Sequence, residues 1–275
     1  MVFIRNIVER TGKVLKKQAL MLAVICAVTV SANVSAYAGV NNMDYIVHAG
    51  GQAGYSIGTN SREAVNNSFM NGYRYIEIDF NFTSDGELVC VHDWDTDYFK
   101  MGKPKGKALS LNEFKDAKIL GQYTTMSAEQ LAWWLHEKPD TYIITDIKEN
   151  NIAGLKYIAE HCGYVKDKII PQIYSESEYD KVKAMGYKNI IYTLYKLSYS
   201  ENTNTSKIVK FAKNHDIYAI TFSDELASEK YVNALKKSGK KLYVHTVNST
   251  SQAEKLSNMG INGIYSDYTK ENLKA

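Results

Sequence analysis

Three residues that could share one divalent metal ion and one phosphate lie close together in the sequence: Glu77, Asp79 and His92. Residues 73–82 alternate as in a strand, so the two acidic side chains point to the same face. Carboxylate oxygens are the ligands that Ca²⁺ and Mg²⁺ prefer, and a histidine beside them can transfer a proton. This spacing predicts metal-assisted chemistry on a phosphate.

The segment after this strand is expected to fold back on it. Residues 83–86 read Thr-Ser-Asp-Gly, which is a turn signal, and residues 88–91 form an apolar run that leads into His92. A parallel crossover needs about a dozen residues or more, so the return strand is predicted to be antiparallel. Counting outward from the turn, this pairing places His92 near Asp79.

Strand-like and helix-like segments alternate along the rest of the chain. Eight strands with helices between them predict a closed (β/α)8 TIM barrel, with the antiparallel return strand inserted after strand two. An open doubly wound sheet is the alternative, but no glycine-rich dinucleotide or phosphate-loop motif follows any strand. The strand segments are residues 45–50, 73–82, 141–148, 169–174, 189–194, 217–222, 241–247 and 263–266, and residues with helix start and stop signals are 62–71, 128–136, 176–185 and 228–238.

One connection, residues 95–122, breaks this rhythm. It contains Lys103, Pro104, Lys105, Gly106 and Lys107 and shows little periodicity. We expect a long excursion over the top of the barrel.

The ends of the predicted strands are polar throughout, and catalytic groups of a barrel lie at the carboxyl ends of its strands. Asp146 adds a third carboxylate to Glu77 and Asp79, and three converging acids suit one hard divalent cation. Lys148 would add a positive charge for the phosphate, and two histidines can divide the work of general acid and general base. The strand-end residues are His48, Glu77, Asp79, His92, Asp146, Lys148, Gln172, Tyr174, His245 and Asp267.

The first 38 residues look like a secretory signal peptide. Five basic residues precede an apolar run over residues 19–30, and Ala36, Tyr37 and Ala38 form the small-x-small pattern that a signal peptidase reads. The run is shorter than the roughly 20 residues that span a bilayer, although an uncleaved anchor remains the alternative and the only expected contact with a membrane. We expect a secreted or cell-surface protein.

The predicted mature chain, residues 39–275, fits one barrel domain. The leader carries five of the 33 basic and one of the 30 acidic residues, which leaves 28 against 29 and a formal net charge of −1. A near-neutral surface offers no electrostatic footprint for nucleic acid, so no nucleic-acid partner is expected. Cys90 and Cys162 are too few for a disulfide framework, and sequence alone leaves their pairing open.

At the strand-end residues the chain resembles the glycerophosphodiester phosphodiesterase family, one of the phosphatidylinositol phospholipase C-like phosphodiesterases. The motifs follow the family's order and span nearly the whole predicted mature chain. They are His48, Ala49 and Gly50; Thr59, Asn60 and Ser61; Glu77, Ile78 and Asp79; Thr83, Ser84, Asp85 and Gly86; His92 and Asp93; Asp146, Ile147 and Lys148; Gln172 and Tyr174; Thr246, Val247 and Asn248; and Ser266, Asp267 and Tyr268.

The resemblance implies cleavage of a glycerophosphodiester to sn-glycerol 3-phosphate and an alcohol, as part of lipid metabolism. A small phosphodiester or a molecule containing glycerol phosphate is therefore the expected partner, with one divalent cation, Ca²⁺ or Mg²⁺, as cofactor. The roles expected by this comparison are catalysis by His48 and His92 in either order, metal binding by Glu77, Asp79 and Asp146, phosphate orientation by Lys148 and Asn60, and further substrate contacts by Gln172, Tyr174, Trp94 and His245.

The chain departs from the family pattern at a few positions. Ala49 replaces an arginine that helps hold the phosphate, Thr59 replaces a glutamate, and Asp146 replaces the usual glutamate ligand. His245 replaces a tryptophan and could supply part of the missing cationic contact. Two rival functions stay open: attack by a neighbouring hydroxyl to give a cyclic phosphate, and a non-catalytic barrel that binds phosphorylated headgroups or a cell-wall polymer.

Overall fold

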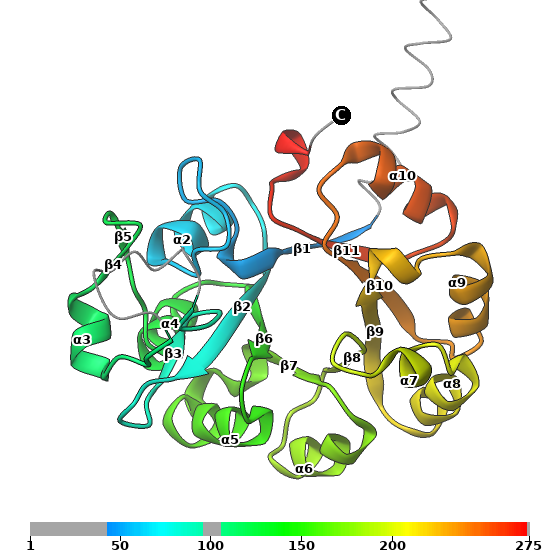
Figure 1. Cartoon of the computed structure of the whole chain (residues 1–275), viewed down its shortest axis with the longest axis horizontal. Coiled ribbons are helices and arrows are strands. Elements are labelled where there is room, and N and C mark those ends of the chain that lie inside the picture. Colours follow the sequence, from blue (N-terminus) through cyan, green and yellow to red (C-terminus); the bar gives the residue numbers. More distant parts are fainter. Residues whose placement is uncertain (1–42, 96–105, 274–275) are drawn as a thin grey trace, which may run out of the picture. The chain divides into compact units, whose positions relative to one another are not determined.

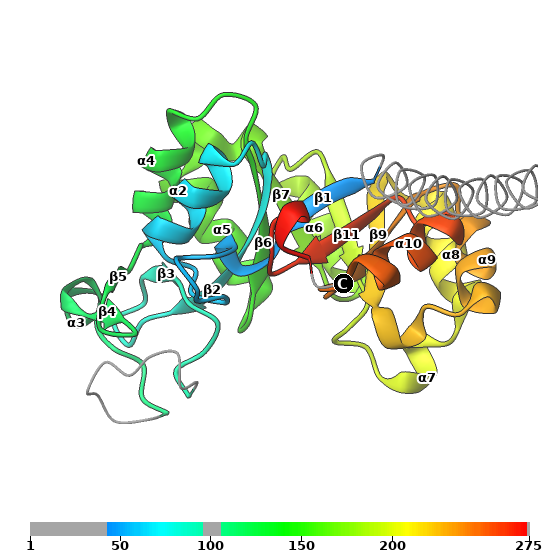
Figure 2. The same cartoon turned by 90° about the horizontal axis from the view of Figure 1, so that it is seen from above.

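The computed structural model describes residues 43–95 and 106–273, shown in Figures 1 and 2. The predicted leader and residues 96–105 of the excursion lie outside these ranges. Within them, every helix is too short or too polar to cross a bilayer.

Eight parallel strands form a closed ring, which confirms the predicted TIM barrel (Figure 1). Strand β1 pairs with β11 on one side and with β2 on the other, so the sheet has no open edge there. In ring order the strands are β1 (Asp44–Val47), β2 (Tyr75–Phe82), β6 (Tyr142–Ile147), β7 (Ile169–Ile173), β8 (Ile190–Thr193), β9 (Ile217–Ser223), β10 (Lys241–His245) and β11 (Gly263–Ser266).

The predicted return strand is also present. Strand β3 (Leu88–Cys90) runs antiparallel to β2, with Cys90 opposite Phe80. Past its end, the Val91 amide donates a hydrogen bond of 3.0 Å to the Asp79 carbonyl oxygen. The backbone next to His92 therefore lies beside Asp79, as the counting predicted.

Helices surround the ring, and serine side chains start many of them (Figures 1 and 2). Ser61, Ser127 and Ser228 each accept a hydrogen bond from a backbone amide of the first turn. The predicted helix at residues 176–185 begins as a 3₁₀ turn, η4 (Glu176–Glu178). The helices are α2 (Arg62–Met70), α4 (Ala128–His136), α5 (Asn151–His161), α6 (Tyr179–Ala184), α7 (Tyr199–Asn202), α8 (Thr205–Asn214), α9 (Glu229–Lys236) and α10 (Thr250–Asn258), with further 3₁₀ turns η1 (His48–Gly50), η3 (Gly163–Lys168), η5 (Asp224–Leu226) and η6 (Lys270–Asn272).

The described part of the excursion has more regular structure than its weak periodicity indicates. It contains helix α3 (Leu111–Asp116), which starts with a capping box at Ser110, and a small hairpin of β4 (Lys118–Ile119) and β5 (Tyr123–Thr124). Phe114 anchors this part to the return strand, in an apolar cluster with Val89, Val91 and Leu109.

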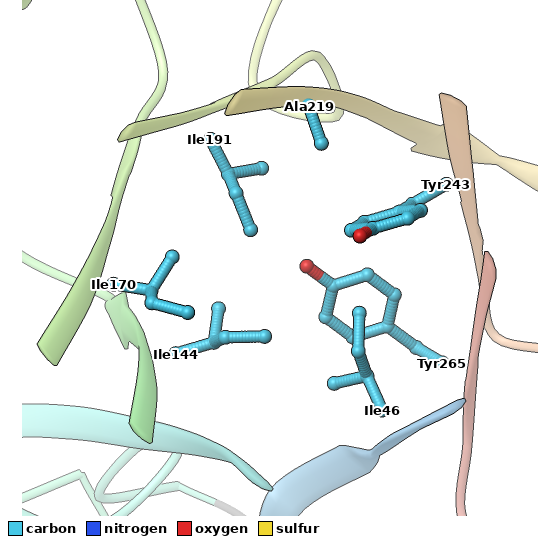
Figure 3. Packing of buried hydrophobic residues seen from close by; sticks show 7 residues of the cluster. All are labelled: Ile46, Ile144, Ile170, Ile191, Ala219, Tyr243 and Tyr265. Carbon is cyan, nitrogen blue, oxygen red and sulfur yellow. The ribbon is translucent and has the colours of Figure 1, made fainter. Parts of the chain in front are cut away.

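The barrel interior is filled by a layer of apolar side chains (Figure 3). Its members come from seven of the eight strands: Ile46, Ile144, Ile170, Ile191, Ala219, Tyr243 and Tyr265. Full burial of one such aliphatic side chain contributes about 1.5–3 kcal/mol. Because side chains alternate along a strand, Asp146 points to the same side as Ile144, one step closer to the carboxyl end. The apolar layer therefore lies directly below the polar side chains at the carboxyl ends of the strands.

Candidate active site

Three buried carboxylates meet at the carboxyl ends of β2 and β6, as predicted. Each of Glu77, Asp79 and Asp146 offers one ligand oxygen, and these oxygens all lie within 4.8 Å of one another. Asp79 and Asp146 are direct partners in the strand register, which sets their separation.

Lys148 and Asn60 hold two of the acids in place. The Lys148 ammonium lies 2.7 Å from Asp79 Oδ1 and 2.7 Å from Asp146 Oδ2, so it neutralises part of the acidic charge. The Asn60 amide donates to Asp79 Oδ2 at 2.8 Å and accepts from the Asp79 backbone amide at 3.0 Å. Asn60 is fully buried, and both polar groups of its side chain bind Asp79. Asn60 was predicted to orient the phosphate; in the structure it positions Asp79.

Glu77 is the least compensated of the acids. Its Oε2 accepts a 2.7 Å hydrogen bond from the Ala49 amide, while its Oε1 is buried with no hydrogen-bond partner in the described part of the chain. Burial, with help from the nearby Asp79, raises the pKa of Glu77 to about 8. An oxygen-only donor set with one buried unpaired carboxylate oxygen fits a hard divalent cation.

Two tyrosines hold the third acid. The Tyr174 hydroxyl donates to Asp146 Oδ1, and the Tyr195 hydroxyl lies 2.9 Å and 3.1 Å from the two Asp146 oxygens. Burial alone would raise the pKa of Asp146, but the Lys148 charge and these hydrogen bonds lower it. Tyr174 was predicted to contact substrate and instead orients Asp146. The sequence reasoning missed Tyr195, although it follows the end of strand β8 as Lys148 follows β6.

His48 is held by hydrogen bonds that run through a fourth acid, Asp267. Its Nδ1 donates to Asp267 Oδ1 at 2.7 Å, and the Asn248 amide donates to Asp267 Oδ2 at 2.6 Å. Burial opposes the charge on His48, but the hydrogen bond to Asp267 and the charge of Glu77 outweigh it and raise the pKa to about 9. The other ring nitrogen, Nε2, lies 3.8 Å from Glu77 Oε2. Asp267 was noted at a strand end, yet its position beside His48 needed the closed ring, since 219 residues separate the two.

His92 and Trp94 have partners other than the three acids. The His92 side chain is about half exposed and pairs with Asp93 at 2.5 Å. Trp94 packs edge-on against Phe114 and donates from Nε1 to the Phe82 carbonyl oxygen at 3.1 Å. Its ring therefore anchors the excursion, and neither side chain lines the cavity described next.

A cavity of about 190 Å³ lies among the strand ends. Two predicted substrate contacts, Gln172 and His245, do line it. Burial, together with nearby His48, lowers the pKa of His245 to about 4, so the side chain is neutral. The expectation that it supplies part of the missing cationic contact stays a prediction. The lining residues are His48, Glu77, Asp146, Lys148, Gln172, Thr193, Tyr195, Thr221, His245 and Tyr265.

The turn after β1 shows why Ala49 is compatible with this site. Ala49 has φ 48° and ψ 40°, followed by Gly50 and Gly51 with positive φ, and this path aims the Ala49 amide at Glu77. A Cβ on Gly51 would lie 2.4 Å from Val47, which leaves no room for a larger residue. The Ala49 side chain itself is buried. Its backbone, rather than its side chain, serves the site.

Comparison with known proteins points in the same direction. Residues 48–271 match the Glycerophosphoryl diester phosphodiesterase family. No match was found among curated proteins.

Solved structures show the same fold. An Oleispira antarctica phosphodiesterase in complex with the product sn-glycerol-3-phosphate is 16% identical, with a TM-score of 0.67 over 85% of this chain and 96% of that one. A Parabacteroides distasonis glycerophosphodiester phosphodiesterase is 18% identical, with a TM-score of 0.67 over 84% and 95%. A Thermotoga maritima glycerophosphodiester phosphodiesterase is 21% identical, with a TM-score of 0.61 over 82% and 94%.

Proposed function

The chain belongs to the glycerophosphoryl diester phosphodiesterase family, and from this premise we propose that it hydrolyses glycerophosphodiesters to sn-glycerol 3-phosphate and an alcohol. The observation that carries the proposal is the convergence of three buried carboxylates, within 4.8 Å, beside a histidine that is oriented by a further acid. This combination can bind a cation and move a proton at one point of the barrel.

Glu77, Asp79 and Asp146 would hold one divalent cation, Ca²⁺ or Mg²⁺. Such an ion polarises phosphoryl oxygens and stabilises the negative charge of the transition state. Lys148 adds a fixed positive charge at the same place and can bind a phosphate oxygen as a point charge. Asp79 is already positioned by Asn60, and Asp146 by Tyr174 and Tyr195, so these two acids need little reorganisation.

His48 supplies the proton transfer at the cavity. Its Nδ1 is bound to Asp267, which leaves Nε2 to face the reacting groups. His92 is the second member of the proposed acid and base pair, in either order. The hydrogen bond from the amide of the preceding residue, Val91, to the Asp79 carbonyl oxygen supports this role. Catalytic hydrogen bonds often shorten only when the substrate is bound, so the exposed His92 ring in the free protein is compatible with this role.

We also propose that the protein acts outside the cytoplasm, as its N-terminal segment indicates. The expected result is that mature protein recovered from the culture medium or cell surface begins near residue 39. Amino-terminal sequencing checks this, and an intact Met1 on a cytoplasmic protein would contradict it.

One assay tests the activity. Purified residues 39–275 are incubated with glycerophosphocholine or glycerophosphoglycerol, with Ca²⁺, with Mg²⁺ or with a chelator, and products are resolved by mass. We expect sn-glycerol 3-phosphate and the free alcohol only when the metal is present. A cyclic phosphate product would instead identify a neighbouring hydroxyl as the nucleophile, and binding without turnover would identify a non-catalytic barrel.

A further inference from the structure

The backbone that carries Lys148 lies past the end of the strand pairing on one side. The pairing of β6 with β7 ends at Thr145, opposite Pro171. On the other side β2 still holds the chain, because the Lys148 amide donates a 2.9 Å hydrogen bond to the Phe80 carbonyl oxygen. The carbonyl groups of Ile147 and Lys148 therefore take their hydrogen-bond donor from outside the pair of β6 and β7.

Lys196 supplies that donor. Its Nζ donates to the carbonyl oxygens of Ile147 and Lys148, each at 3.0 Å. Lys196 lies in the loop after β8, and β7 separates β8 from β6 in the ring, so the side chain reaches past one whole strand. The two carbonyl groups belong to the planar peptide units on either side of the Lys148 Cα. This contact therefore restricts the backbone angles from which the Lys148 side chain projects.

The same ammonium group also holds Tyr174. Lys196 Nζ lies 3.8 Å from the centre of the Tyr174 ring, which is within the range of a cation–π contact. The hydroxyl of that ring donates to Asp146 Oδ1. Lys196 is absent from the residues that line the cavity among the strand ends, as far as the chain is described. Any influence of Lys196 on the site therefore passes through Lys148 and Tyr174.

We propose that Lys196 is a positioning residue of the active site, which holds Lys148 and, through Tyr174, Asp146 in the arrangement that binds the cation and the phosphate. Aspartate has a single methylene between its Cα and its carboxylate, so the place of its oxygens follows the backbone and the groups that touch it. This inference rests on the proposed function and adds to it a residue outside the motif positions.

The test measures metal affinity by calorimetric titration of Ca²⁺ and of Mg²⁺ into purified residues 39–275. Lys196→Met removes the ammonium group but keeps most of the side chain's length, and Lys196 lies at the surface, so the variant should fold. We expect its metal affinity to fall by about tenfold or more, as is usual when a partner of a metal ligand is lost. Lys196→Arg keeps the positive charge and several N–H donors, so it should recover most of this loss.

Lys168 provides a matched control at the opposite end of the barrel, because it directly precedes β7. Its Nζ also donates to two carbonyl oxygens, that of Leu135 at 3.0 Å and that of Lys138 at 2.7 Å. Lys168→Met removes the same kind of contact far from the acids. It should lower the melting temperature and leave the metal affinity of the folded protein unchanged.

Wild-type metal affinity in Lys196→Met, an equal loss in Lys168→Met, or an equal loss in Lys196→Arg would overturn the inference. Failure of the proposed function is distinguishable, because calorimetry measures metal binding without turnover. A wild type that binds metal but hydrolyses no glycerophosphodiester would contradict the function, and the metal affinities of the variants would still decide the role of Lys196. A wild type that binds no metal would contradict both.

Discussion

The two ends of the barrel interior obey different rules, although they share strands. The side chains of the apolar layer around Ile144 are buried and point into the ring of strands (Figure 3). One step along β6, Asp146 stands among three other charged groups, and Glu77 and His245 keep buried polar atoms unpaired in the described part of the chain. The apolar layer stabilises the fold. Holding like charges close together at the polar strand ends is destabilising, and the stability of the apolar layer offsets this cost.

The largest expected effect separates chemistry from packing with two histidines. His48→Ala should lower turnover of a glycerophosphodiester by about 10²- to 10⁴-fold, the usual contribution of a general acid or base, when turnover is measured well below the melting temperature of the variant. His215 lies outside the barrel and packs on Phe211 and Tyr179. His215→Ala should do the reverse, lowering the melting temperature at unchanged turnover. Near wild-type turnover in His48→Ala would remove His48 from the mechanism.

The second prediction uses two positions of one strand. Ile144→Ala should lower the free energy of unfolding by about 2–5 kcal/mol through the cavity it creates, while the metal affinity of the folded protein stays unchanged. Asp146→Asn should weaken metal binding by more than about tenfold. Mutating a residue that only hydrogen-bonds to a metal ligand commonly lowers metal affinity by about that factor, and Asp146 is proposed as a ligand itself. Urea unfolding and calorimetric metal titration measure the two quantities. If both variants lose metal affinity equally, the division between the layers is wrong.

The third prediction concerns pH in the metal-free protein. The pKa of His48 is raised from 6.5 to about 9 and that of Glu77 from 4.5 to about 8, so each group binds its proton more tightly in the folded state. For a raised pKa the stabilisation is complete below the unfolded value and is lost as pH rises through the folded value. With chelator present, the melting temperature should therefore fall from about pH 4.5, where the contribution of Glu77 begins to be lost, to about pH 9, where that of His48 is lost.

A matched variant assigns this pH dependence. In His48→Gln, Glu77→Gln the slope above pH 6.5 should largely disappear, while Ile144→Ala should keep the slope at a lower melting temperature. A wild-type melting temperature that is flat over this window in chelator would show that the two groups do not titrate as the geometry indicates.

The alternation of residue types predicted the strands and helices of the barrel well, because these elements depend on local sequence patterns. Strand periodicity, serine caps and the short turn before β3 each act within a few residues, and the barrel, its return strand and the acidic triad followed from them. Asn60 and Trp94 show the limit. Their motif positions are near the site, but which atom each side chain contacts depends on packing against distant segments, such as Phe114 for Trp94.

The same limit applies to residues that the sequence reasoning did not assign. Tyr195 and Asp267 act through Asp146 and His48, partners 49 and 219 residues away. Strand-end position was the available signal for both. It could not show which strand end faces which, since that depends on closure of the ring.

The smallest expected effect tests whether the backbone is strained in the turn after β1, next to the site, compared with a regular helix elsewhere in the barrel. Ala49 has φ 48°, a left-handed conformation that costs a non-glycine residue about 1 kcal/mol. Glycine adopts this conformation freely but loses more entropy on folding, so Ala49→Gly should change the free energy of unfolding by less than about 1 kcal/mol. Ala132, buried in helix α4, provides the control, because Ala132→Gly should destabilise by about 0.5–1 kcal/mol or more. Turnover should stay near wild type in Ala49→Gly, since the amide that binds Glu77 is retained. Equal destabilisation by both substitutions would show that the turn after β1 stores no strain, and the contrast between the two ends would then rest on side chains alone.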